Sequence, residues 1–211
     1  MAPVRAIGRI GAAPHWSLAY LVNLALGFAA LWLAWPVVAH VVAVEPLVAG
    51  RPPAEVGRIL NFDLAVQLFN VVFTPLVVWL LAALLLTLAS PPAKRPFPRA
   101  LLVFFALNAY AWLPAAVGTL LQAILLRQHG PLAYHDAAEV TRALPDSLAL
   151  LRPHGLPREI AFLGFWDVFN LWSLVLIGIG YSLLNDREPY VGLLLAFGFG
   201  LGLALMGALG T

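Results

Sequence analysis

The sequence predicts an all-α integral membrane protein: a bundle of five transmembrane helices with short amphipathic helices in the third, outer connection. Two observations support this fold class. The chain of 211 residues is 62% hydrophobic and only 10% charged, whereas a soluble domain has roughly 45–50% apolar and about 25% charged residues. In addition, five separate stretches reach the roughly 20 apolar residues that a membrane-spanning helix needs. We therefore expect lipid, rather than water, to surround most of this chain.

The five expected spans cover residues 17–44, 63–89, 101–126, 160–184 and 190–209. Each span is predicted to be helical because a lone segment in lipid has to satisfy its own backbone hydrogen bonds. The first span follows a basic start, as in a signal peptide, but it is far longer than the roughly 7–15 apolar residues of a signal sequence. We therefore interpret it as an uncleaved span, and residues 1–211 as a single transmembrane domain.

Basic residues predict the orientation of the chain. Arg5 and Arg9 precede the first span, in a segment without an acid. The second connection contains Lys94, Arg95 and Arg99, and it also lacks acids. Because loops with an excess of Lys and Arg stay in the cytoplasm, we expect the N-terminus inside and the C-terminus outside.

The third connection, residues 127–159, is the one sizeable polar region of the sequence. A short helix is expected to start at His135 or Asp136, and Pro145 should end it. Pro157 suits the first turn of the fourth span, because its missing N–H would be unpaired there anyway. Two interpretations of this connection stay open: amphipathic helices on the outer membrane face, or a solvated loop with helical propensity.

The fourth predicted span contains an acid. With a helix start near Pro157, Asp167 would lie about 15 Å along the helix, and Asn170 follows three residues later on the same face. An Asp at the centre of a spanning helix costs roughly 2.5–3.5 kcal/mol on insertion scales. We therefore expect Asp167 to face other helices, a cavity or water.

The second predicted span opens with a similar polar stripe. Asp63, Gln67 and Asn70 are spaced four and three residues apart, which places them on one face of a helix. With five spans, the second and fourth helices both enter the membrane from the outside. Their polar stripes should therefore lie in the same leaflet.

We expect the two stripes to meet, together with polar residues from the outer end of the third span. The candidate cluster consists of Asp63, Gln67, Asn70, Gln122, Arg127, Asp167 and Asn170. One interpretation is a polar pocket in which Arg127 is the counter-charge of an acid. The other is structural: Asn and Gln join helices, contributing on the order of 1 kcal/mol, and Asp63 only marks a helix start at the positive end of the dipole. Of the two interpretations, we favour the structural one.

Small residues and prolines predict how the helices pack. Gly198 with Gly202 forms a small-xxx-small pair in the last span, and Gly200 with Ala204 forms another. Such faces let helices approach closely. We expect a partner face inside the chain, because the fourth span offers two glycines, Gly178 and Gly180.

The first three spans each contain a proline, namely Pro36, Pro75 and Pro114. A proline inside a helix removes one backbone hydrogen bond and kinks the helix. In lipid the freed carbonyl needs another donor. We therefore expect a kink and a backbone group with a new partner in each of these spans.

Motifs for catalysis and cofactor binding are absent from the sequence. The chain has no cysteine, and no nucleophile–base pair can be assembled from its residues. His129, His135 and Asp136 come nearest to a metal site, but we interpret them as solvated surface. The few positive charges are scattered, which argues against a nucleic-acid partner. The sequence therefore predicts no enzyme, no metal and no cofactor.

Residues 144–184, "LPDSLALLRPHGLPREIAFLGFWDVFNLWSLVLIGIGYSLL", resemble the C-terminal half of bacterial members of the Yip domain family. The residues that carry the resemblance are Asp167, Phe169, Trp172, Leu176, Gly178 and Gly180. It implies a five-span, non-enzymatic protein with a cytoplasmic N-terminus, in a prokaryotic cytoplasmic membrane. Such a protein would organise membrane lipids, partner membrane proteins or copies of itself.

Eukaryotic members of that family act with Rab GTPases in vesicle trafficking. They have a long polar N-terminus and an Asp-Leu-Tyr-Gly-Pro motif, and this chain has neither. A Rab-type partner is therefore in doubt. The alternative to the Yip-type role is a small transporter or lipid-translocating protein that uses the polar cluster between spans two, three and four.

Overall fold

The computed structural model describes residue 10 and residues 14–45, 48–91, 94–136, 139–140, 147–151 and 155–209. Its helices are α2 (Ser17–Val44), α3 (Pro53–Leu88), α4 (Phe97–Ala111), α5 (Leu113–His129), η1 (Pro131–Ala133), η2 (Leu148–Leu151), α7 (Pro157–Gly164), α8 (Val168–Asn185) and α9 (Pro189–Leu209). Within this part of the chain, five helical segments are long and apolar enough to cross a membrane. The prediction of an all-α, five-span membrane protein is confirmed.

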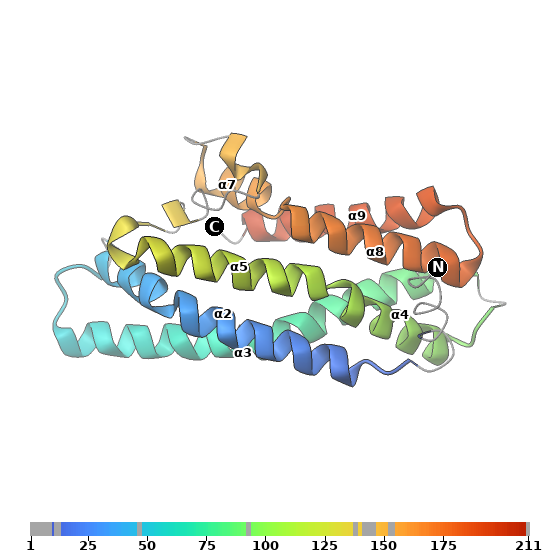
Figure 1. Ribbon diagram of the computed structural model, residues 1–211, viewed down its shortest axis with the longest axis horizontal. Coiled ribbons are helices and arrows are strands. Elements are labelled where there is room, and N and C mark those ends of the chain that lie inside the picture. The colour runs from blue at the N-terminus through green and yellow to red at the C-terminus, as the bar shows by residue number, and fades with distance from the viewer. Residues whose placement is uncertain are drawn as a thin grey trace.

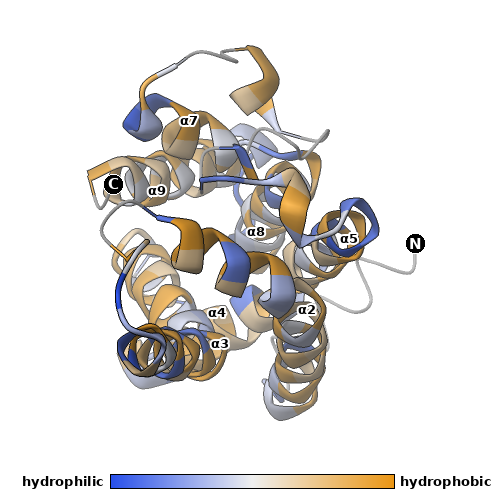
Figure 2. Cartoon of the chain, turned by 90° about the vertical axis from the view of Figure 1, so that its left-hand side faces the viewer, coloured by the Kyte–Doolittle hydropathy of each residue, from blue (hydrophilic) through white to orange (hydrophobic). Residues whose placement is uncertain are grey.

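The third span, made of α4 and α5, runs through the middle of the bundle (Figure 1). On one side, α3 packs against α4, and α2 packs against both α5 and α3. On the other side, α8 contacts α4 and α5, and α9 packs against α8. The short helix α7 packs on α9. An end-on view shows apolar residues around the outside of the bundle and polar residues mainly near its ends, as expected for a protein in lipid (Figure 2).

The first and last spans match the sequence prediction, but the second starts earlier. Helix α3 begins at Pro53 and not near residue 63. Pro52 and Pro53 suit a helix start because neither has an N–H that the first turn would leave unpaired, and Glu55 lies favourably in that turn. The prediction followed hydropathy, which rises only after Asp63. Asp63 therefore lies inside a helix and is not a helix start.

The third span is broken at Trp112, between α4 and α5. Pro114 follows two residues later and has no N–H to donate to α4, so the chain ends one helix and begins another. Pro36 and Pro75 lie inside α2 and α3, which continue through them. One turn before Pro75, the hydroxyl of Tyr20 donates a hydrogen bond to Val72 O at 3.0 Å.

The fourth span is shorter than predicted, because residues 165–167 break it into α7 and α8. The membrane-spanning part is α8 alone, from Val168. Asp167 is therefore the residue before the span and does not lie about 15 Å inside a helix. The prediction of one helix from Pro157 was wrong, although Pro157 does begin α7 as expected.

The third connection, predicted to lie outside, is partly helical. Within its described residues it contains η1, η2 and α7, and α7 buries Ile160 while packing against η2 and α9. Asp136 accepts a hydrogen bond from Glu139 N at 2.6 Å, as expected for a helix start. The rest of that predicted helix, residues 141–145, lies outside the described residues. So do Arg5 and Arg9, and the orientation of the chain stays a prediction.

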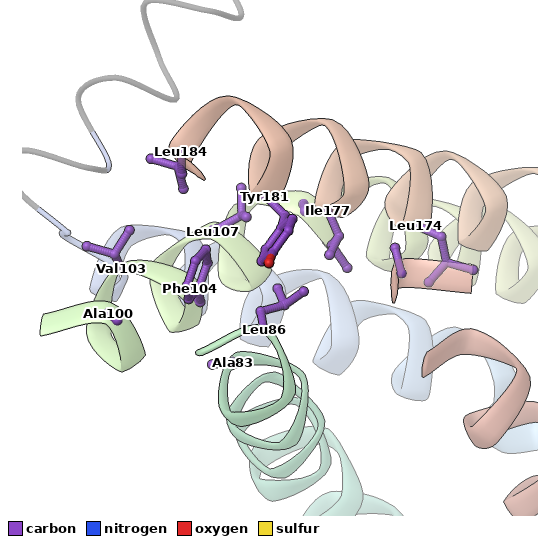
Figure 3. Packing of buried hydrophobic residues seen from close by; sticks show 12 residues of the cluster. Ala83, Leu86, Ala100, Val103, Phe104, Leu107, Leu174, Ile177, Tyr181 and Leu184 are labelled. Atoms are coloured by element: carbon purple, nitrogen blue, oxygen red, sulfur yellow. The ribbon is translucent and has the colours of Figure 1, made fainter. Parts of the chain in front are cut away.

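The main core lies between α3, α4 and α8 (Figure 3). Leu86 of α3 packs there with Phe104 and Leu107 of α4, and with Ile177 and Tyr181 of α8. The rings of Phe104 and Tyr181 stack at 5.6 Å. Because lipid is as apolar as these side chains, their association depends on close van der Waals packing.

Helices α8 and α9 approach each other at glycines. A methyl group at Gly192 would overlap with Gly178 O and would lie 2.5 Å from Ser182 Oγ. The hydroxyl of Ser182 accepts a hydrogen bond from Gly192 N at 3.2 Å and donates one to Glu188 O at 3.0 Å. Gly180 of α8 meets Leu107 of α4 instead. Of the two glycines expected to form the partner face for the last span, Gly178 therefore does so and Gly180 packs on α4.

In α9 the packed face is not the one expected from Gly198 and Gly202. Both glycines are exposed, with no atom near the position of a Cβ. The buried positions of the helix are Gly192, Ala196, Gly200 and Ala204, which recur every four residues. The second pair of the sequence analysis, Gly200 and Ala204, is therefore the one that packs.

Replacing Gly192 with Ala is expected to destabilise the bundle by about 1–3 kcal/mol, because the new methyl group forces α8 and α9 apart. Thermal unfolding of purified protein in detergent measures the effect. Gly198→Ala is the matched control on the same helix, and it should leave stability unchanged or raise it by up to about 1 kcal/mol through helix propensity. Equal destabilisation by both substitutions would contradict this packing.

Candidate functional site: the polar residues of the spans

Asp167 caps the start of α8. Its backbone is extended, and its Oδ1 accepts a hydrogen bond from Asn170 N at 2.7 Å. Its Oδ2 accepts a second one from Asn170 Nδ2 at 2.8 Å. A side-chain oxygen in this position satisfies one of the N–H groups that a helix start leaves free. The carboxylate, with the residue only 7% exposed, thus has a clear structural role.

Asp167 and Asn170 also stabilise the chain where it breaks between α7 and α8. Asn170 Nδ2 also donates to Phe165 O at 2.9 Å, so one amide joins the end of one helix to the start of the next. Residues 147 and 167 form an isolated antiparallel bridge, in which Leu148 N donates to Trp166 O at 3.2 Å. The third connection is thereby fixed to the start of the fourth span.

The stripe of α3 has a different environment. Asp63 and Gln67 are half-buried, whereas Asn70 is exposed on the outside of the bundle. Asn70 Oδ1 accepts a weak hydrogen bond from Thr74 Oγ1 at 3.4 Å. Oδ2 of Asp63 is buried and has no hydrogen-bond partner among the described residues.

The structure does not bring the two stripes together. Helix α3 packs on α2 and α4, and α8 packs on α4, α5 and α9. The first half of α3 and the start of α8 lie on opposite sides of α2 and α5 (Figure 1). Among the described residues, no hydrogen bond or ion pair links Asp63, Gln67 or Asn70 to Asp167. The single cluster expected from the sequence is therefore not formed.

The two remaining members of the expected cluster lie on α5. Gln122 is half-buried on this helix, which packs mainly against α2. Arg127 is exposed in the last turn of α5, where a positive charge is favourable to the helix dipole. Arg127 makes no ion pair with Asp63 or Asp167 among the described residues, so it is not the counter-charge of either acid.

Sequence reasoning missed a set of buried polar residues around the break at Trp112. Ser173 of α8 is fully buried; its Oγ accepts a hydrogen bond from Ala115 N at 3.3 Å and donates one to Phe169 O at 2.9 Å. Pro114 signalled that this region would contain unpaired backbone groups, but nothing in the sequence pointed to Ser173 as the partner. The hydroxyl supplies an acceptor to an N–H of the first turn of α5.

The opposite side of the break has an equivalent partner. Asn23 of α2 is buried, and its Nδ2 donates to Ala19 O at 2.8 Å and to Ala109 O at 3.3 Å. Ala109 lies in the last turn of α4, where carbonyl groups lack partners from their own helix. Asn108, also fully buried, donates from Nδ2 to Phe104 O at 2.8 Å. These asparagines lie in apolar stretches, and the hydropathy pattern gave no sign of their role.

Nothing in the described part of the chain resembles a metal centre, since no three His, Cys, Asp or Glu residues lie close enough to hold an ion. His129 Nδ1 lies 2.8 Å from Leu125 O in its own helix. His135 lies 3.3 Å from Glu139 in an exposed pair. The described polar residues of the spans thus serve mainly to connect and terminate helices.

Substituting Asp167 with Ala should destabilise the protein by about 0.5–2 kcal/mol, because the cap of α8 is lost. Asp167→Asn is the matched control: Asn keeps a side-chain oxygen for Asn170 N and should retain most of the stability. Both are compared by thermal unfolding in detergent. If the uncharged Asn variant is as unstable as the Ala variant, charge matters more than capping and this assignment is wrong.

No protein-family model, curated protein or solved structure matches this chain. The resemblance to the Yip domain family therefore rests on the residues quoted for it alone. The chain's own helices show an integral membrane protein with five apolar helical spans.

Proposed function

We propose that this protein is a non-enzymatic membrane protein that organises transmembrane helices, including a second copy of itself, through the outer face of α3. The observation that carries the proposal is the exposed polar pair of Asn70 and Thr74 on that helix. At 1.5 Å per residue, Asn70 lies about 27 Å from the Leu88 end of α3, within about one hydrocarbon thickness. With Leu88 at one boundary, Asn70 lies just inside the opposite boundary of a hydrocarbon layer about 30 Å thick, where an amide still gains from a partner on another helix.

The side-chain amide of Asn70 makes fewer hydrogen bonds within the chain than its donor and acceptor groups allow. Thr74 occupies one acceptor position at 3.4 Å, and the described residues provide no acceptor for the amide nitrogen of Asn70. Leaving such a group unpaired in hydrocarbon is unfavourable, and Asn is a residue type that joins helices in membranes. A second helix on this face would supply the missing partner.

The side chains next to this pair suit a helix–helix contact. The rings of Phe69 and Phe73 stack at 4.5 Å, although both are largely exposed. Val66 and Val77 continue the apolar face along the helix. Because Asn both donates and accepts, the face is complementary to itself across a two-fold axis. This favours a second copy as the occupant.

The alternative, transport or lipid translocation through a polar cluster, loses its supporting observation. The stripes of α3 and α8 do not meet, and Asp167 and Asn170 are engaged in capping α8. The space between α3, α4 and α8 is filled by Leu86, Phe104 and the apolar side chains around them. An organising role also agrees with what the Yip resemblance implies, and we keep that role as part of the proposal.

Single-cysteine cross-linking tests the proposal without background, because the chain contains no cysteine. Val77 is 54% exposed on the α3 face, and Val77→Cys in liposomes is expected to give a disulfide-linked dimer on oxidation. Adding Asn70→Leu should reduce the dimer roughly threefold or more, because one interhelical hydrogen bond is on the order of 1 kcal/mol.

Leu194→Cys is the control on α9, where Leu194 is 71% exposed on another face. It should give little dimer at the same protein density. Equal yields from both positions, or a yield from Val77→Cys that does not change with Asn70→Leu, would show that α3 is not a specific contact face.

A further inference from the structure

A pocket lies at the end of the bundle that carries the second connection. It is formed by the end of α3, the start of α4 and the end of α8, and its volume is about 310 Å³. Ligand pockets typically measure roughly 300–1,000 Å³. Since three spans end here, the pocket lies at the level of the membrane–water boundary. None of the seven residues expected to form the cluster lines it.

The charged residues that line this pocket are both positive, Lys94 and Arg95. Arg95 is fixed by a hydrogen bond from Nη1 to Leu184 O at 3.0 Å, which leaves its other N–H groups available. Lys94 pairs with Asp186 just outside the pocket. The hydrogen bond from Lys94 lowers the pKa of the Asp186 carboxyl, so this acid stays charged at neutral pH. The side chain of Asp186 is largely exposed, and an ion pair with an exposed partner contributes little.

The pocket also contains the start of α4, which follows Pro96. The first turn of α4 carries a partial positive charge. Pro98 has no N–H and Ala100 N donates to Pro96 O, so the N–H of Phe97 is the backbone donor that this turn offers among the residues lining the pocket. Together with Lys94 and Arg95, this end of α4 favours an anionic group such as a phosphate. The hydroxyl hydrogens of Thr87 and Ser90 are donated to Ala83 O and Leu86 O.

One buried polar group of the pocket lacks a partner. Asn185 is 2% exposed and lines the pocket, and its Nδ2 donates to Tyr181 O at 3.1 Å. Its Oδ1 has no hydrogen-bond partner among the described residues. The partner of the other amide atom is a carbonyl, which only accepts, so that atom is the nitrogen and the unpaired atom is the oxygen. An oxygen needs a hydrogen-bond donor as its partner. A phosphate oxygen cannot be that donor. A hydroxyl in the pocket can, once the Asn185 side chain turns its buried oxygen toward the pocket.

The remaining lining is apolar. Leu88, Phe97, Ala100 and Phe104 form a wall on the side of the membrane interior, and Phe97 is half exposed. Ala100 and Phe104 are already buried in the core, but Leu88 and Phe97 are exposed. A free phosphate would leave these two side chains uncovered, whereas an acyl chain would cover them. The occupant that fits every part is therefore amphipathic, with an anionic head and an apolar tail.

We propose that this pocket binds an anionic phospholipid whose headgroup carries a free hydroxyl, such as phosphatidylglycerol. The phosphate contacts Lys94, Arg95 and the start of α4, and a glycerol hydroxyl donates to Asn185 Oδ1. An ammonium headgroup is disfavoured, because it would lie beside two positive side chains. Basic pockets between spans are a recognised setting for anionic lipid heads. This inference is independent of the α3 face, and the cross-linking result does not affect it.

Lipid-dependent thermal unfolding of the delipidated protein in neutral detergent tests the proposal. Phosphatidylglycerol should raise the unfolding temperature at lower concentration than phosphatidic acid, which lacks the hydroxyl, and phosphatidylcholine should have the smallest effect. Arg95→Gln should weaken phosphatidylglycerol binding roughly tenfold, as expected for a lost charge-assisted hydrogen bond. Arg158→Gln on α7 makes the same change in charge outside the pocket and should leave binding unchanged.

Asn185→Leu separates the two halves of the proposed headgroup contact. This variant should lose the preference for phosphatidylglycerol over phosphatidic acid but keep the preference for both over phosphatidylcholine. The Arg95 comparison remains decisive if Asn185→Leu does not fold. Equal effects of phosphatidylcholine and phosphatidylglycerol would overturn the proposal. So would equal weakening by Arg95→Gln and Arg158→Gln, or an equal shift with inorganic phosphate or glycerol 3-phosphate, which would indicate a site for a free phosphate.

Discussion

The structure depends on one constraint: a backbone N–H or C=O group at membrane depth has to find its partner within the protein. Long unbroken helices meet this requirement alone, but two of the spans adjoin breaks, at Trp112 and at residues 165–167. Side chains from other helices or from the next turn supply the missing partners there. Ser173 serves the start of α5, Asn23 the end of α4, and Asp167 the start of α8. This requirement explains the positions of these three polar side chains.

The same requirement separates structural polar groups from those that point to function. Asp167 and Asn170 are engaged with each other and with Phe165 O, so a ligand is not needed to explain them. Unused hydrogen-bonding capacity remains at Asn70 on the outside of α3 and at Asn185 in the pocket beside Lys94, as it does at Asp63 Oδ2 and Asn108 Oδ1. Asn70 and Asn185 are the two that lie on a surface or in a pocket where a ligand or second helix could supply the partner. We have proposed that Asn70 contacts a helix of a second copy and that Asn185 accepts a hydrogen bond from a lipid headgroup. A protein that associates laterally and binds lipid accounts for both.

Hydropathy predicted the number of spans because long apolar stretches have no other stable environment. It gave the bounds of α2 correctly, but it missed the first ten residues of α3, which are helical without being strongly apolar. Asp167 could have been identified as a cap, because an Asp immediately before a long apolar run is typical of a helix start. The packed face of α9 could not be predicted, since both glycine pairs have the same spacing and only the position of α8 decides between them.

Amide hydrogen exchange at Ala115, followed in wild-type protein and in Ser173→Ala, tests the central claim most directly. The claim is that a side chain from another span satisfies the backbone group freed by the helix break. We expect Ala115 N–H to be protected in the wild type and to lose much of that protection in Ser173→Ala, while the amides in the middle of α8 keep theirs. Unchanged protection of Ala115 in the variant would show that the broken helix does not depend on Ser173, and would contradict the account.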